Sequence, residues 1–82
     1  MAIVTVTTSA TTILDGTQVA DTMVTVGAVP IRIATGSAVG RTFDNSTPID
    51  RGQIIVFPAG TIVTGFVGTG SISAPVYVES FA

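Results

Sequence analysis

The chain has 82 residues and a net charge of −2, and only 10% of its residues are charged, against roughly 25% in an average soluble domain. It contains no lysine, histidine, cysteine or tryptophan. Zinc and transition-metal sites therefore lack their usual nitrogen and sulfur ligands, and three arginines with a negative total charge argue against binding of a nucleic-acid backbone. The length suffices for one domain, expected to span residues 1–82.

Four residue types build half of the chain: 14 Thr, 12 Val, 9 Ile and 6 Ser. Thr, Val and Ile are β-branched, which suits a pleated surface better than a helix, so the sequence predicts an all-β protein. A coat of threonine and serine with so few charges gives little protection against association. We therefore expect a homo-oligomer or a larger assembly. The alternative is a monomer whose threonines simply occupy exposed strand faces.

No targeting or membrane segment is expected. The first residues, Met-Ala-Ile-Val-Thr-Val, lack the basic and long apolar regions of a secretory signal. No stretch approaches the roughly 18 apolar residues of a membrane helix. The expected place of synthesis is the cytoplasm.

The first part of the chain alternates as strands do. Residues 2–8 place Val4 and Val6 on one face and Ile3 on the other, which predicts a first strand. Residues 9–12 are small and polar and predict a bend, followed by a turn at 15–16, Asp-Gly.

The next two strands are predicted at residues 22–26, with Val24 and Val26 inward, and at 31–33, with Arg32 outward between two isoleucines. From residue 34 to 46 the pattern weakens to a loop with one short strand at 40–43. A further turn is expected at 50–52, Asp-Arg-Gly.

Residues 53–67 contain two β-rich runs around the turn-forming segment Pro58-Ala59-Gly60-Thr61, which predicts a hairpin. In the first run Ile55 and Phe57 share one face, and Ile54 and Val56 share the other. A strand that is apolar on both faces needs two covers. One is the domain's own core, and the other is a second layer of the same chain or another copy of the protein.

The last predicted strand runs from residue 71 to 81. Its core face holds Ile72, Ala74, Val76 and Val78, and its other face includes Tyr77 and Phe81, which are candidates for burial against a neighbouring subunit. Pro75 donates no ladder hydrogen bond, so the segment is expected at a sheet edge or at a bulge. With six to eight short strands, the fold expected is a small antiparallel β-sandwich or barrel.

The chain offers one weak candidate for a catalytic site, a group of charged residues within residues 41–51. Asp44 and Asp50 could form a pair of catalytic carboxylates, but turn formation is the favoured interpretation for both. Arg41 and Arg51 bracket them, either as exposed salt bridges or, as we favour, at a subunit contact. No pattern indicates a cofactor or a calcium loop.

A resemblance follows from the leading strand Met-Ala-Ile-Val-Thr-Val-Thr, the Asp-Gly turn, the Phe57–Thr61 segment and the alternating terminal strand. In length and in its overall residue pattern, the whole chain resembles small virion proteins of tailed bacteriophages, most of all head decoration, or cement, proteins. The resemblance implies a β-rich oligomer, often a trimer, on the outer surface of the capsid, with the major capsid protein as partner. It also implies that residues 1–8 serve as an N-terminal arm, if they are not the first strand.

The sequence therefore predicts a non-enzymatic structural subunit that stabilises a capsid by surface contact. A tail or head-fibre component and a carbohydrate-binding β module are the alternatives, and an enzyme is the weakest. The residues expected at the interface are Ile54, Val56, Tyr77, Phe81, Arg41 and Arg51.

Overall fold

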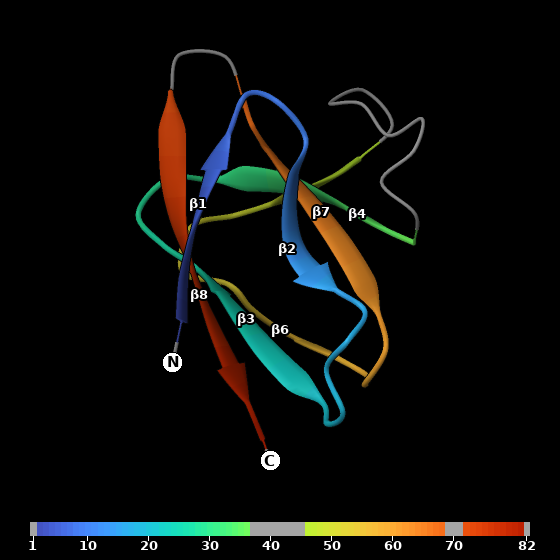
Figure 1. The fold of residues 1–82 in the computed structure, drawn as a ribbon. Coiled ribbons are helices and arrows are strands. Elements are labelled where there is room, and N and C mark those ends of the chain that lie inside the picture. Colours follow the sequence, from blue (N-terminus) through green and yellow to red (C-terminus); the bar gives the residue numbers. More distant parts are fainter. Residues whose placement is uncertain (1, 37–45, 69–71, 82) are drawn as a thin grey trace.

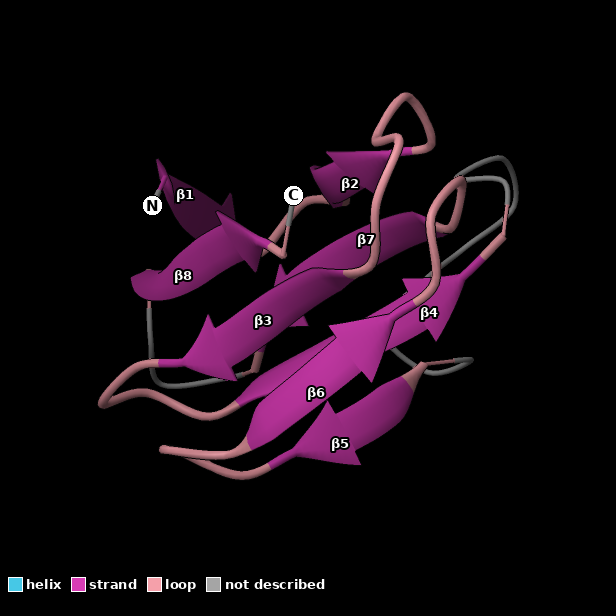
Figure 2. Ribbon diagram, turned by 90° about the horizontal axis from the view of Figure 1, so that it is seen from below, coloured by secondary structure: helices cyan, strands magenta, loops and turns pink. Residues whose placement is uncertain are grey.

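A computed structural model describes residues 2–36, 46–68 and 72–81, and these residues form strands, turns and bends but no helix (Figure 1). The prediction of an antiparallel all-β fold is confirmed. Eight strands make two four-stranded sheets packed as a sandwich (Figure 2). The strands are β1 (Ala2–Thr7), β2 (Thr11–Asp15), β3 (Thr22–Val26), β4 (Ile31–Thr35), β5 (Thr47–Ile49), β6 (Ile54–Phe57), β7 (Ile62–Val67) and β8 (Ser73–Ser80).

Sheet A has the strand order β1-β8-β3-β6, and sheet B has the order β2-β7-β4-β5. Every pair is antiparallel. The segment at the N-terminus is the first strand: β1 pairs with β8, and its Val6 is fully buried. The expected strand at residues 40–43 lies outside the described residues.

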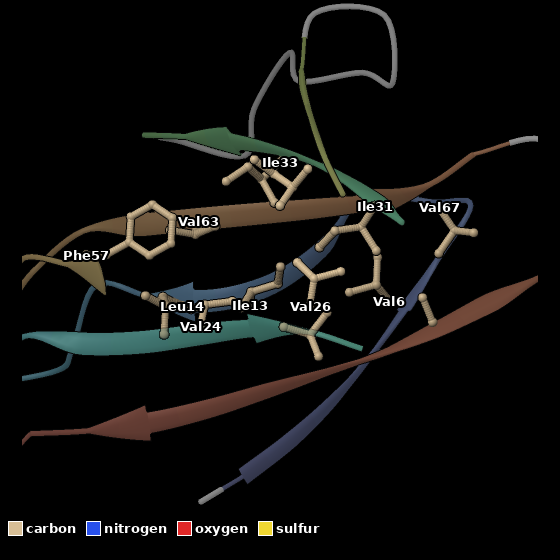
Figure 3. Close-up of a cluster of buried hydrophobic side chains, with 13 residues drawn as sticks. Val6, Ile13, Leu14, Val24, Val26, Ile31, Ile33, Phe57, Val63 and Val67 are labelled. Atoms are coloured by element: carbon tan, nitrogen blue, oxygen red, sulfur yellow. The ribbon is translucent and has the colours of Figure 1, made fainter. Parts of the chain in front are cut away.

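The core lies between the two sheets and consists mostly of the alternate residues of each strand that face inward. Figure 3 shows Phe57, Val24 and Val26 of sheet A facing Val63 and Ile31 of sheet B. The predicted inward positions of Val24 and Val26 are confirmed. Burial of a side chain of this size stabilises the fold by about 1.5–3 kcal/mol.

Strand β2 departs from simple alternation. Its register with β7 shifts between Thr12 and Leu14, and this bulge turns both Ile13 and Leu14 into the core. A Cβ on Gly65 would lie 2.6 Å from Ile13 Cδ1, so the glycine provides the space that Ile13 occupies. β2 begins at Thr11, so the predicted bend at residues 9–12 was too long by two residues.

The predicted hairpin at residues 53–67 is wrong, although its turn is present. The Thr61 amide donates to the Pro58 carbonyl at 3.3 Å, and Gly60 has a φ of 83°. However, β6 pairs with β3 in sheet A, and β7 pairs with β2 and β4 in sheet B. Turn residues specify a local reversal of the chain, and here the reversal carries the chain from one layer to the other.

The expected edge position or bulge at Pro75 is also wrong, because β8 lies between β1 and β3. The Gly27 amide donates to the Pro75 carbonyl at 3.2 Å, so Pro75 faces the residue just past the end of β3. The Gly27 carbonyl accepts instead from the Gly52 amide at 3.3 Å. The donor that proline lacks is thus replaced by another segment.

The last strand begins later than predicted, at Ser73. Ile72 therefore lies outside β8, and it is 87% exposed rather than part of the core. Ala74 and Val76 are fully buried as expected.

Candidate interaction surface

The outward side of sheet A carries two neighbouring rows of mostly apolar side chains. One row across all four strands runs through the register partners Ile3, Tyr77, Thr25 and Ile54. The neighbouring row runs through Glu79, Met23 and Val56. Together with Pro75, these residues are called the outer face here.

The outer face is mostly apolar and partly open to solvent. Ile3, Ile54 and Val56 are 66%, 57% and 51% exposed, and Met23 and Tyr77 are half-buried. Glu79 is the one charged residue among the described outward positions of these strands. Exposed apolar groups that gather on one side of a small domain mark an interaction site more often than scattered ones do.

Tyr77 is held in place by its neighbours. A Cβ on Gly27 would lie 2.8 Å from the Pro75 carbonyl oxygen and 3.4 Å from Tyr77 Cε2, so the ring lies close to a backbone that carries no side chain. A shallow hollow of about 330 Å³ lies beside it, lined by Met23, Thr25, Tyr77 and Glu79. The hollow offers one carboxylate and otherwise apolar contacts or hydroxyls.

The structure brings three predicted interface residues, Ile54, Val56 and Tyr77, onto this one face. Phe81 follows β8, is 61% exposed, and its amide donates to the Asp21 carbonyl at 3.0 Å. Arg51 is exposed in the turn that precedes β6. These two lie at the margin of sheet A rather than within the two rows.

Arg41 lies outside the described residues. Ile3 and Met23 belong to the outer face but were not predicted as interface residues. The alternation of residues 2–8 places Ile3 on the face opposite to Val4 and Val6. Alternation within one strand does not show which other strands lie beside it, so the sequence predicted no neighbours for Ile3.

The outward side of sheet B differs. Its Arg32 is outward, as predicted, and its Nε donates to Ser46 Oγ at 3.1 Å while its terminal nitrogen donates to the Ser46 carbonyl. Phe66, the register partner of Arg32, is 3% exposed. Thr64 is fully buried, and its hydroxyl has no hydrogen-bond partner among the described residues. The exposed apolar surface is therefore concentrated on sheet A.

A second concave region lies at one end of the sandwich, a cleft of about 710 Å³ between β2 and the ends of β3 and β8. Asp15 is the one ionisable residue in its described lining. Its Oδ1 accepts from the Thr17 hydroxyl at 2.6 Å and from the Thr17 amide at 3.0 Å. These bonds lower the pKa of Asp15, so this carboxylate stays ionised and is a poor general acid or base near neutral pH.

Of the candidate catalytic pair Asp44 and Asp50, only Asp50 lies within the described residues. Asp50 Oδ1 accepts from the Arg51 amide at 3.0 Å, and the Asp50 carbonyl accepts from the Gln53 amide at 3.3 Å. Asp50 therefore organises a turn. In the described part of the chain, no three acidic residues lie together as a metal site would require, and no helix has the length and apolarity to cross a membrane.

No protein-family model fits this chain, and no curated protein and no solved structure matches it. The resemblance to tailed-phage virion proteins therefore stays a prediction, and the outer face is the feature on which a functional argument depends.

Proposed function

We propose that this protein is a non-enzymatic structural subunit that works by contact through the outer face of sheet A, as a capsid decoration, or cement, protein. The observation that carries the proposal is the row across sheet A that runs from the exposed Ile3 through the half-buried Tyr77 and Thr25 to the exposed Ile54. Such a subunit needs a complementary surface rather than a catalytic pocket.

The outer face is not needed to complete the fold. The accessible surface of the chain is 4536 Å², close to the about 4,600 Å² that surface scaling gives for a compact monomer of this mass. The residues of the core cluster are at most 8% exposed in the single chain, so the core is closed without a partner. Ile54 and Val56 do not belong to the core. Burial of their exposed area against another protein would stabilise a complex by about 25 cal/mol per Å² before association costs.

The shape of the outer face favours a protein partner. Its residues follow a sheet rather than line an enclosed cavity, and the hollow beside Tyr77 is small and shallow. Its aromatic content is a single tyrosine, which is a poor platform for a sugar. The capsid as the specific partner, and assembly into an oligomer on it, come from the resemblance.

Co-sedimentation tests this function. Purified protein is mixed with mature capsids of the phage that encodes it, after removal of their own copy, and the capsids are pelleted. We expect the wild-type chain in the pellet at a saturating, fixed ratio, and at least tenfold weaker binding for Ile3→Lys. Val19→Lys is the matched control, because Val19 is 91% exposed and lies outside sheet A.

A wild-type chain that stays in the supernatant at saturating concentration would overturn the decoration role. Electron microscopy with a labelled chain separates the alternative sites, since label on the tail or on head fibres would replace the capsid with another part of the virion.

A further inference from the structure

Among the described residues, strand β6 has one edge to which no other strand is hydrogen-bonded. It is the last strand of sheet A and pairs with β3 along its other edge. The Val26 amide donates to the Gln53 carbonyl at 2.9 Å, which makes Gln53 a residue that faces β3. Because antiparallel strands alternate in the direction of their backbone groups, Ile55 and Phe57 also face β3. The amides and carbonyls of Ile54 and Val56 therefore point away from the sheet.

The same two residues have exposed side chains. Ile54 and Val56 lie on the outer face and are more than half exposed. Natural edge strands are guarded by charged side chains, prolines or inward-pointing charges, and β6, with the sequence Ile-Ile-Val-Phe, has none. The strand is also clearly bounded. Gly52, with a φ of 74°, ends the preceding turn, and Pro58 begins the next.

We propose that β6 pairs antiparallel with β6 of a second copy of this chain, across a twofold axis beside Ile55. In this register Ile54 lies opposite Val56 of the second copy, and each such pair exchanges both main-chain hydrogen bonds. The two A sheets then join into one continuous sheet with a doubled outer face. The inference rests on the proposed function, a protein that works by contact, and names its first partner.

The register is self-complementary. The contact surface is the same on both copies, as twofold symmetry requires, and Ile54 and Val56 supply equal numbers of donors and acceptors. A shift by two residues in either direction places Gly52 or Pro58 opposite a paired residue. The Gly52 amide already donates to Val26, and Pro58 has no amide proton. Both shifted registers therefore lose hydrogen bonds.

Charge supports the same arrangement. Arg51 lies in the turn before β6, and the Ala59 amide of the turn after β6 donates to Asp21 Oδ1 at 3.3 Å. Antiparallel pairing about a twofold axis brings the turn before β6 of one copy to the side of the turn after β6 of the other, so each Arg51 lies on the side of the other copy's Asp21. Such exposed pairs set register and association rate more than affinity.

The contact is short, so the dimer is expected to be reversible. Stable interfaces bury about 1,200–2,000 Å², and one short strand from each copy gives less. We expect a dissociation constant between about 1 µM and 1 mM. In an assembly, attachment of both copies to one shell would strengthen the contact by raising their effective concentration.

Sedimentation equilibrium of four proteins from about 10 µM to 1 mM tests the pairing. We expect the wild type, Ile3→Lys and Val19→Lys to form dimers, and Ile54→Lys to shift the dissociation constant at least tenfold towards monomer. Ile3 shares the row of Ile54 but lies on β1, at the opposite edge. Far-ultraviolet circular dichroism of each variant verifies the fold.

Three results would overturn the pairing: a monomer throughout the concentration range, a trimer, or a dimer that survives Ile54→Lys but is lost in Ile3→Lys. The last result means stacking of outer faces. A strictly monomeric protein that still co-sediments with capsids would refute the pairing and leave the proposed function standing.

Amide hydrogen exchange gives a second readout on the unmodified protein. The Ile54 and Val56 amides should exchange more slowly as the concentration rises, whereas the Ile55 amide, which faces β3, should change less. Equal exchange of Ile54 and Val56 at low and high concentration would also contradict the proposal.

Discussion

Asp15 ends β2, and its carboxylate organises the turn that follows. Oδ1 accepts from both the hydroxyl and the amide of Thr17, and Gly16 between them has a φ of 87°. Hydrogen bonds to the ionised form favour that form. This residue therefore contributes to the turn through its charge as well as through its conformational preference.

We predict that the pKa of Asp15 lies below its usual value of 3.8, mainly because of the Thr17 hydroxyl. Since the folded-state pKa is lowered, the contribution of Asp15 to stability is present above the unfolded-state pKa and is lost as the pH falls through the folded-state pKa. Thr17→Val keeps the amide bond and removes the hydroxyl, so it should raise the pKa.

Carboxyl chemical shifts followed by NMR from pH 7 to pH 2 measure this effect. Thr17→Ser, which keeps the hydroxyl, is the matched control and should leave the pKa of Asp15 unchanged. An unchanged Asp15 titration in Thr17→Val would show that the hydroxyl bond is not the cause.

At the scale of elements, β6 shows how one strand serves two purposes. Phe57 is buried in the core, whereas the adjacent Val56 is half exposed on the outer face. Adjacent residues of a strand point to opposite faces, so these neighbours have separate roles.

We predict that Phe57→Ala lowers the free energy of unfolding by about 3–5 kcal/mol, because it leaves a cavity between the sheets. Val56→Ala, one residue away, should change it by about 0.5 kcal/mol or less. Urea unfolding of both variants at low protein concentration, where the chain is monomeric, measures the two values. Similar losses would mean that the outer face is buried within a single chain.

β8 shows an element whose position the sequence misrepresents. Pro75 normally marks an edge, yet β8 is central because β3 ends where the proline lacks its donor. Proline is excluded from central strands because it cannot donate a hydrogen bond to the neighbouring strand. At Pro75 no donation to β3 is needed, because β3 has ended and the Gly27 carbonyl accepts from the Gly52 amide. The information that decides this is the length of the neighbouring strand.

At the scale of the molecule, most consecutive strands lie in different sheets. Among the described strands, only β4 and β5 are both consecutive and paired, and β1 pairs with β8 at the other end of the chain. Few contacts can therefore form early through short loops. Chains dominated by such distant pairings fold slowly.

We predict that the isolated chain folds in milliseconds to seconds. Stopped-flow dilution from urea, with the fluorescence of Tyr77 as the signal, measures the rate, since the chain has one tyrosine and no tryptophan. Folding within microseconds would contradict the observed topology. The rate should not depend on protein concentration, because the core closes within one chain.

Much of the local structure was predictable. The β class, the first strand, the turns at Gly16, Gly52 and Gly60, and the opposite faces of β6 all follow from the residues themselves. The hairpin at Pro58, the edge position of Pro75 and the core position of Ile72 were wrong, since each depends on a neighbouring strand. Of the candidate surface, the sequence identified Ile54, Val56 and Tyr77 but not that Ile3 joins them.

The sequence by itself determined which segments become strands, where the chain turns and which side chains share a face, because β-branched residues, prolines and glycines act on their own backbone. Tertiary structure alone decided which strands pair, that β6 lies at an edge and that its second apolar face stays uncovered. Strand pairing joins segments far apart along the chain, and alternation within a strand carries no information about its neighbour.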